Sequence, residues 1–302
     1  MDSNDLQVFV AVARAGGITR AAGALHTVQS NVTARIQTLE RELGVPLFQR
    51  HSRGVTLTSA GQMLLPYATE VERLLAEAVR AVGDVAAPRG PLQIGSLETT
   101  AARRLPPVLL AYSAAYPDVD LRLQMGTTAE LIAAVLDRRL EGALVAGPVS
   151  HPALIEEPIV DEELVLVTTP ACPGIDAGLA DGCELKLLVL RSGCSYRERL
   201  ERLLAARGLT GLRLLEFGML DAIIGCAAAG IGITLLPRAV VEPARAAGRV
   251  AVHVLPEDQA WVTTVFIRRR DAFTSTALTC FLRCCKQVEA DAAGRAAVAS
   301  AQ

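Results

Sequence analysis

The pattern of apolar and polar positions changes twice along the chain and divides it into three parts. Up to residue 43, apolar residues recur at helical spacing. Residues 64–85 carry a stricter repeat, and beyond residue 91 short apolar runs alternate with helical patterns. The first part predicts short helices, the second a single long helix, and the third an open α/β sheet in which strands and helices alternate.

The first part predicts three short helices separated by tight turns. Four residues form the apolar face of the first helix: Leu6, Phe9, Val10 and Ala13. A capping box from Asn4 to Gln7 would begin this helix, and Gly16-Gly17 would end it. Thr19 can cap the second helix. The buried side of that helix consists of Ala21, Ala22 and Leu25. The small alanine side chains let two helices cross closely.

The third helix combines an apolar face with a polar one. Its apolar positions are Val32, Ile36, Leu39 and Leu43. The polar face holds uncharged hydrogen-bonding groups and one guanidinium: Gln29, Ser30, Asn31, Thr33 and Arg35. Such groups at a helix N-terminus suit base edges and phosphates in a major groove, so residues 16–40 predict a DNA-binding helix-turn-helix. The alternative is an ordinary polar face on a helix of an all-α core.

Residues 44–58 predict a β-hairpin, because two short β-prone runs flank the turn-like Ser52-Arg53-Gly54. A hairpin beside a recognition helix is the wing of a winged helix. Arg50, His51 and Arg53 at its tip would then meet phosphate or the minor groove. The alternative is a solvated turn.

A single long helix should follow, opened by a second capping box from Ser59 to Gln62 and continuing to about Val85. Its apolar residues alternate spacings of four and three: Leu64, Ala68, Val71, Leu75, Ala78, Val82 and Val85. This repeat is the seam of a coiled coil, although a single buried helix could mimic it. At 1.5 Å per residue the helix would span roughly 40 Å, enough to hold two recognition helices in adjacent major grooves. Ala-Pro-Arg-Gly-Pro at 87–91 marks a hinge.

Beyond the hinge, strands alternate with helices. We predict strands at 92–96, 119–126, 142–147, 163–169, 185–192, 212–218, 230–237 and 261–269, and helices at 99–115, 129–138, 196–207, 220–229 and 273–290. Residues 292–302 should form a frayed tail. Ligands of such sheets bind where strands end and helices begin, which indicates the loops 96–100, 126–128 and 146–148.

Composition restricts the possible functions. The 302 residues are 51% hydrophobic and 4% aromatic, with a net charge of −2, so any DNA affinity needs a local patch. Residues 1–58 hold six arginines against four acidic residues, an excess of two. Neither a secretory leader nor a membrane span is evident, which predicts a cytoplasmic protein without membrane attachment. Seven cysteines predict reduced thiols, and Cys280, Cys284 and Cys285 read as packing residues and not as a metal site.

Over nearly its whole length the chain resembles the LysR-type transcriptional regulators. The matching N-terminal residues are Phe9, Gly16-Gly17-Ile18-Thr19-Arg20-Ala21-Ala22, Leu25, Gln29-Ser30, Ile36, Leu39-Glu40, Leu43-Gly44, Leu47-Phe48, Arg50, Leu57-Thr58 and Ala60-Gly61. Farther on, the matches are Ile94-Gly95, Leu105-Pro106, Tyr116-Pro117, Gly230-Ile231-Gly232 and Leu236-Pro237. The segment 193–197 with Leu200-Glu201 also resembles a subgroup related to a putrescine-utilisation regulator.

The resemblance implies an α/β protein with three parts: an N-terminal winged helix-turn-helix, a long linker helix that dimerises, and a two-lobed effector domain like a periplasmic binding protein. The expected boundaries are 1–58, 59–86, the hinge 87–91 and 92–302. Lobe I would take about 92–160 and 268–290, and lobe II about 161–267. Expected partners are double-stranded operator DNA, a small-molecule co-inducer, RNA polymerase and further copies of the chain in a homotetramer, a dimer of dimers. No cofactor or metal is implied.

The resemblance also implies which residues touch these ligands. On DNA these would be Gln29, Ser30, Thr33 and Arg35, with Arg50 and Arg53 on the wing. Asn31 shares that face but stands where the family usually has alanine. Val28 replaces the usual capping serine or threonine of the recognition helix, a loss of ~1 kcal/mol, although Thr27 could cap one residue earlier.

Effector contacts in the family come from the cleft loops. Here they would be Ser96, Thr99, Thr100, Thr127, Thr128 and Gly147, facing Ser192, Cys194, Ser195, Tyr196 and Met219. Hydroxyls at helix N-termini suit an anion such as a carboxylate. Glu98 and Asp221 nearby would instead favour an amine, and the subgroup likeness favours an amine or amino acid.

Two other functions compete with ligand-controlled DNA binding. Cys183 and Cys194 both lie in the second lobe, so a redox sensor is possible, although no feature of the sequence activates either thiol. An enzyme or transport receptor could also use a two-lobed α/β domain. No nucleophile–base pair or phosphate loop accompanies it here, so we predict that the protein is not an enzyme.

Overall fold

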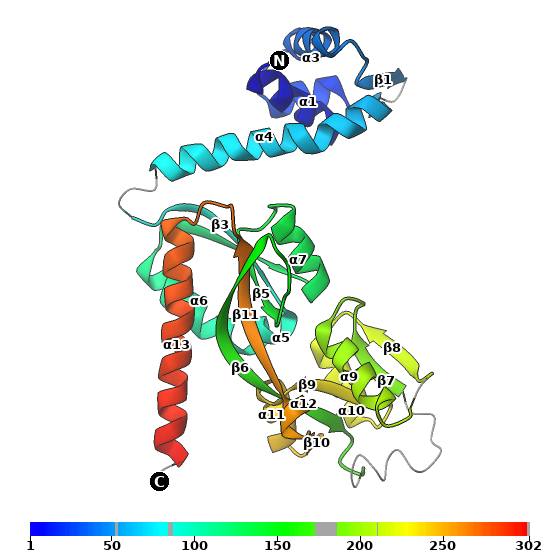
Figure 1. The fold of residues 1–302 in the computed structure, drawn as a ribbon, viewed down its shortest axis with the longest axis vertical. Helices are drawn as coiled ribbons and strands as arrows, with labels where there is room; N and C mark the ends of the chain where they lie inside the picture. Colours follow the sequence, from blue (N-terminus) through cyan, green and yellow to red (C-terminus); the bar gives the residue numbers. More distant parts are fainter. Residues whose placement is uncertain (52–53, 84–86, 173–185, 210, 301–302) are drawn as a thin grey trace. The chain divides into compact units, whose positions relative to one another are not determined.

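The chain folds into two units, Met1–Val85 and Ala86–Gln302 (Figure 1). The computed structural model describes residues 1–51, 54–83, 87–172, 186–209 and 211–300, and the side chains of all of these except residues 50, 80, 293 and 295–300. Among the helices in these ranges, none is long and apolar enough to cross a membrane.

The first unit is a winged helix-turn-helix followed by a long helix, as predicted. Its elements are α1 (Ser3–Ala15), α2 (Ile18–Ala24), α3 (Gln29–Leu43), β1 (Phe48–His51), β2 (Gly54–Leu57) and α4 (Ser59–Gly83). Gly16 ends α1 in the left-handed conformation, with φ of 61°. β1 and β2 pair antiparallel, from Phe48 opposite Leu57 to His51 opposite Gly54. The core includes Phe9 of α1, whose ring centroid lies 5.3 Å from that of Phe48.

The three predicted N-caps of this unit are wrong by one or two residues. Asp2 caps α1, because its Oδ1 accepts a hydrogen bond from the backbone N–H of Asp5 at 2.8 Å. Thr58 caps α4, because its Oγ1 accepts from the N–H of Gly61 at 3.0 Å. α2 begins after the extended Gly17 and has no side-chain cap, so Thr19 lies inside it. In each case the predicted capping residue falls within the first turn.

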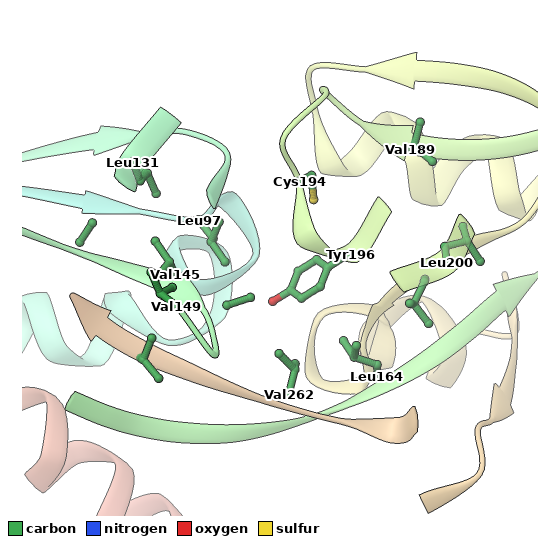
Figure 2. Close-up of a cluster of buried hydrophobic side chains, with 14 of the residues drawn as sticks. Leu97, Leu131, Val145, Val149, Leu164, Val189, Cys194, Tyr196, Leu200 and Val262 are labelled. Carbon is green, nitrogen blue, oxygen red and sulfur yellow. The ribbon is translucent and has the colours of Figure 1, made fainter. Parts of the chain in front are cut away.

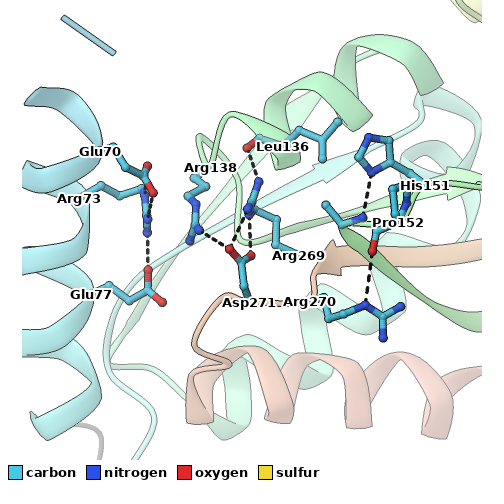
Figure 3. Close-up of polar contacts among 11 residues, drawn as sticks. Glu70, Arg73, Glu77, Leu136, Arg138, His151, Pro152, Arg269, Arg270 and Asp271 are labelled. Carbon is cyan, nitrogen blue, oxygen red and sulfur yellow. Dashed lines mark hydrogen bonds and ion pairs between the residues drawn. The ribbon is translucent and has the colours of Figure 1, made fainter. Parts of the chain in front are cut away.

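The predicted seam of α4 is buried in its first half and exposed farther along. Leu64, Ala68 and Val71 pack into the core of the first unit. Farther along the same face, Leu75 and Val82 are exposed by 41% and 79%. Further exposed apolar side chains on this helix are Met63, Tyr67, Leu74 and Val79. Within the described residues, the seam is therefore exposed from Leu75 to Val82, where Leu74 and Val79 widen it. Figure 3 shows Arg73 between Glu70 and Glu77 on the same helix.

The second unit is built on a seven-stranded mixed sheet in the order β10-β6-β11-β5-β3-β4, with β9 paired to β6. Its strands are β3 (Gly90–Ser96), β4 (Val119–Met125), β5 (Gly142–Ala146), β6 (Leu154–Thr168), β9 (Thr234–Pro237), β10 (Ala251–Val254) and β11 (Trp261–Arg269). β3 pairs parallel with β4 and β5, and β11 runs antiparallel to β5 and β6.

Two lobes share this sheet, and β6 and β11 run from one into the other (Figure 1). Residues 154–163 of β6 pair with β11, and residues 164–168 pair with β9 and β10 instead. A second, parallel sheet in lobe II consists of β7 (Lys186–Leu190) and β8 (Arg213–Phe217). The helices that cover the sheets are α5 (Glu98–Arg103), α6 (Leu105–Ala115), α7 (Thr128–Leu136), α9 (Ser195–Ala205), α10 (Leu220–Ala228), α11 (Arg238–Ala246), α12 (Glu257–Ala260) and α13 (Thr276–Ser300).

Several element predictions need correction. The helix expected over 99–115 is two helices, because the backbone turns at Arg104 before the prolines that open α6. The short elements α11, β10 and α12, between residues 238 and 260, were not predicted. The expected frayed tail is wrong for residues 292–300, which continue α13. Alanine-rich sequence after Glu289 supports this helix without an apolar pattern that would reveal it.

One polar cluster fixes the end of β11. Asp271 accepts hydrogen bonds from Arg269 at 2.8 Å and from Arg138 at 2.6 Å (Figure 3). These guanidinium groups lower the pKa of Asp271 to about 2. The carboxylate thereby joins the turn after α7 to the last residue of β11.

Candidate nucleic-acid interface and ligand cleft

The N-terminus of α3 presents the polar face predicted to contact DNA. Gln29, Ser30 and Asn31 are exposed, and Thr33 is half-buried. Thr33 donates a hydrogen bond to the carbonyl of Gln29 at 2.9 Å, and Thr19 of α2 lies 3.3 Å from the Gln29 side-chain oxygen. The turn thus holds α2 and α3 together while three polar side chains stay accessible.

Arg35 has a structural partner that sequence reasoning missed. Its guanidinium lies 2.9 Å from the carboxylate of Asp5, a buried residue of α1 with 6% of its surface exposed. The Arg35 side chain itself remains 31% exposed. The two residues are 30 positions apart in sequence and join α1 to α3, so replacing Arg35 affects stability as well as any DNA contact. Its role on DNA stays a prediction.

Val28 is the N-cap of α3, as expected, and no side chain caps this helix. Val28 is 65% exposed. Thr27 does not replace it, because its hydroxyl accepts instead from the side chain of Asn31 at 3.0 Å. The first N–H groups of α3 are therefore left for solvent or for a DNA phosphate.

Hydrogen bonds donated by backbone N–H groups hold the wing to the helices. Glu40 of α3 accepts hydrogen bonds from the N–H groups of Leu47 and Phe48, at 2.7 and 3.2 Å. On β2, the N–H of Val55 donates to the carbonyl of Gly16 at 3.2 Å. A Cβ on Gly54 would lie 2.4 Å from that oxygen, so this approach requires glycine.

Of the predicted wing residues, Arg53 and the side chain of Arg50 lie outside what the structure describes. His51 ends β1 and is exposed. The wing contacts with DNA therefore stay predictions.

In the second unit a cavity of about 40 Å³ lies between the lobes. It is lined by Leu97, Glu98, Thr99, Met125, Gly126, Thr127, Leu190, Arg191, Cys194 and Tyr196. Four of these residues were predicted as effector contacts: Thr99, Thr127, Cys194 and Tyr196. A water needs about 10–15 Å³ of such space, so the cavity holds only a few waters in this conformation.

Direct hydrogen bonds between the lobes keep this cleft narrow. The Leu220 N–H at the start of α10 donates to the Glu98 carboxylate at 2.9 Å. The Thr99 hydroxyl lies 3.5 Å from that of Tyr196. The hydroxyls of Thr128 and Ser195 are 3.4 Å apart, so these two predicted residues meet across the cleft although neither lines the cavity.

Tyr196 closes the apolar side of the cleft. Figure 2 shows its ring extending from α9 towards Leu97 and Val145 of the other lobe. Burial raises the pKa of Tyr196, and it also raises the pKa of the Cys194 thiol. Both groups are therefore neutral at physiological pH.

The remaining predicted effector residues lie beside the cavity. Ser96 is buried and donates to the carbonyl of Leu97, and the buried Thr100 hydroxyl has no hydrogen-bond partner within the described part of the chain. The carbonyl of Gly147 accepts from Arg199. Ser192 and Met219 are exposed near the ends of β7 and β8.

Two charged residues of the cavity were not among the predicted contacts. Glu98 was noted only as a nearby acid, and Arg191 was overlooked although it directly follows the apolar run of β7. A charged residue at the carboxyl end of a buried strand is the signal that could have identified it.

The cysteines of α13 pack as predicted. Cys280 and Cys285 are buried, and burial raises the pKa of Cys285 to about 12. Within the described residues, no group of three His, Cys, Asp or Glu side chains is placed to hold a metal ion. Cys183 of the redox hypothesis lies outside those residues, so its pairing with Cys194 stays a prediction.

Two family descriptions match this chain. Residues 3–62 match the bacterial regulatory helix-turn-helix protein of the lysR family, and residues 86–290 match the LysR substrate binding domain. The HTH-type transcriptional regulator GltR of Bacillus subtilis (strain 168) is 47% identical over 277 residues, which are 92% of this chain and 93% of the relative. The HTH-type transcriptional regulator CzcR of Bacillus anthracis is 42% identical over 283 residues, 94% of this chain and 96% of that relative.

Solved structures share the fold. A full-length OxyR variant from Pseudomonas aeruginosa matches with a TM-score of 0.67 at 20% identity, over 95% of this chain and 94% of that one. Full-length CbnR, solved in complex with its target DNA, matches with a TM-score of 0.63 at 23% identity, over 95% of this chain and 100% of that one.

Proposed function

This chain belongs to the LysR family of DNA-binding transcriptional regulators, and we propose that its effector is an amino acid or a small amine bound between lobes I and II. The family accounts for the winged helix-turn-helix and the effector-binding domain, and its members are regulators and not enzymes. Family membership alone leaves the chemistry of the effector open. An amino acid or amine agrees with the local likeness of residues 193–197 to a putrescine-utilisation regulator subgroup.

One observation carries the proposal: the interlobe cavity is lined by one carboxylate, Glu98, and one guanidinium, Arg191. A ligand with a carboxylate and an ammonium group can pair with both, and such charge-assisted hydrogen bonds are the strong ones. The apolar wall of Leu97 and Tyr196 would contact its side chain. Glu98 already accepts from Leu220, so an ammonium group would engage its second oxygen.

The effector would act by shifting the balance between lobe arrangements. The present cleft is narrow, so a ligand larger than a few waters requires the lobes to separate about β6 and β11. A ligand shifts this equilibrium only by its difference in affinity for the two states. That shift would change how paired recognition helices engage the operator.

We further propose that the protein works in the cytoplasm as a dimer of dimers that also contacts RNA polymerase. The exposed half of the α4 seam supports the dimer, because apolar side chains at this spacing pair in coiled coils. On the operator, the contacts would come from Gln29, Ser30, Asn31, Thr33 and Arg35, with Arg50 and Arg53 on the wing.

Thermal-shift screening of the full-length chain against amino acids and polyamines tests the effector proposal. A stabilising compound at 100 times its Kd adds about 2.7 kcal/mol to the unfolding free energy. Arg191→Gln should abolish the response to an amino acid, and Glu98→Gln should abolish the response to an amine. Arg103→Gln, which changes an exposed arginine outside the cavity, is the control. An unchanged response in both cavity variants would place the ligand elsewhere.

A further inference from the structure

We propose that lobe II contains a second ligand site, an anion-binding pocket between α9 and α12. The pocket has a volume of about 210 Å³ and is lined by Arg199, Arg202, Leu203, Ala206, Leu235, Asp258 and Gln259. None of these residues lines the interlobe cavity. The volume is below the ~300–1,000 Å³ of sites for drug-sized ligands, which fits a small metabolite bearing a carboxylate or phosphate group.

The charge of this pocket is unbalanced. Arg199 and Arg202 stand one helical turn apart on α9, and among the described residues neither forms an ion pair. Arg199 donates to the carbonyls of Trp261 and Gly147, at 3.4 and 3.2 Å, and Arg202 donates to the carbonyl of Glu198 at 3.3 Å. Burial and then the neighbouring Arg202 lower the pKa of Arg199. Asp258 supplies one opposing charge, which leaves an excess of one positive charge in the lining.

Two other arginines of this unit are paired with carboxylates instead. Arg197, on the same helix, is paired with Glu201 and Glu216, both at 3.0 Å. Arg104 is paired with Glu162 and Glu289. Two adjacent guanidinium groups that hydrogen-bond only carbonyls still have N–H donors for an anion, which would also relieve their mutual repulsion. The side-chain oxygens of Asp258 and Gln259 can accept hydrogen bonds, so they favour an anion that also carries a hydrogen-bond donor.

Arg199 links the pocket to the other lobe. Gly147, whose carbonyl accepts from Arg199, directly follows β5 of lobe I, and Trp261 begins β11, one of the strands shared by the lobes. An anion that draws the Arg199 guanidinium towards the pocket would weaken this interlobe hydrogen bond. Trp261 is the only tryptophan of the chain, so its fluorescence reports on changes around its contact with Arg199.

Titration of the full-length protein with inorganic phosphate, and separately with malonate, tests the proposal at constant ionic strength. Calorimetry measures the affinity, and Trp261 fluorescence locates the change. We expect saturable binding with a Kd of ~1 mM or tighter and at least ~10-fold weaker binding in Arg202→Gln. Arg202 is exposed, so this substitution should leave the fold intact.

Arg207→Gln is the matched control, because Arg207 is also exposed and donates to the carbonyl of Leu203 four residues earlier, yet lies outside the pocket. It should bind both anions like the unmodified protein, as should Arg191→Gln in the interlobe cavity. The proposal would be overturned if neither phosphate nor malonate gave a saturable heat of binding. Equal affinity in Arg202→Gln would mean that the anion is an adventitious ion only, and it would overturn the proposal as well.

Discussion

Arg35 shows how one residue can carry a fold and a function together. Its pair with the buried Asp5 joins α3 to α1, while 31% of its side chain stays exposed and available to DNA. The sequence pattern placed Arg35 on the polar face but held no sign of a partner 30 residues away. Ion pairs between distant elements depend on tertiary packing, which periodicity does not encode.

Arg35→Ala should lower the unfolding free energy by about 1–3 kcal/mol, because the Asp5 carboxylate loses its donor. Operator binding should also weaken by ~1–3 kcal/mol through the lost DNA contact. The double variant Asp5→Asn/Arg35→Ala should recover part of the stability but none of the operator affinity, as measured by denaturation and by binding titration. Wild-type operator affinity in the double variant would remove Arg35 from the DNA-contact residues.

His253 makes the stability of lobe II depend on pH. Burial lowers its pKa below 6.5, and its Nε2 lies 2.8 Å from the hydroxyl of Thr168. Below pH 6.5 the unfolded chain therefore binds a proton that the folded state resists, so the unfolding free energy falls as pH drops. Denaturation at about pH 7.5 and 5.5 should show a smaller fall for His253→Gln. An equal fall in the unfolding free energy of the unmodified protein and of His253→Gln would mean that other groups cause the pH dependence.

At the scale of elements, α3 is stable despite its missing N-cap. Val28→Ser should stabilise the protein by about 0.5–1 kcal/mol, because the new hydroxyl can accept from a first-turn N–H. Val45→Ser is the control, since Val45 is also exposed but lies beyond Gly44, outside a capping position. Thermal denaturation compares the two. An increase shared by both variants, or none in Val28→Ser, would contradict the capping account.

α4 should hold two copies of the chain together through its exposed apolar face. Val79 and Val82 are 75% and 79% exposed, so a glutamate at either position costs the isolated unit little but places charge in this apolar face. Val79→Glu and Val82→Glu should shift the mass in sedimentation towards the monomer with helical content retained. Ala76→Glu adds the same charge at an exposed position outside that apolar face. An unchanged mass in both seam variants would place the interface elsewhere.

Elements with a strong period were predictable, and elements defined by local or distant contacts were not. Alternating apolar runs located β3, β4, β5 and β7, and helical spacing located α1 and α3. The N-caps were missed because several Asp, Asn, Ser and Thr residues near each helix start are equally suitable. The four-residue α12 and β10 are too short to show a period.

For the whole molecule, the rule that ligands bind at strand ends indicated three loops, and two of them, 96–100 and 126–128, contribute residues to the cavity between the lobes. The cavity does bring Thr99, Thr127, Cys194 and Tyr196 together. The rule could not predict how narrow the cleft is. The Glu98–Leu220 hydrogen bond spans 122 residues and narrows the site, and only the folded arrangement of both lobes reveals it.

A ligand in the cleft should control how the DNA-binding unit engages its operator. DNase I footprinting of the full-length protein on operator DNA selected from a random pool measures this directly, with and without the amino acid or amine found by thermal shift. We expect the ligand to change the length or the bending pattern of the footprint. Arg191→Gln or Glu98→Gln should remove this change while keeping the footprint of the free protein. An identical footprint at saturating ligand would contradict it.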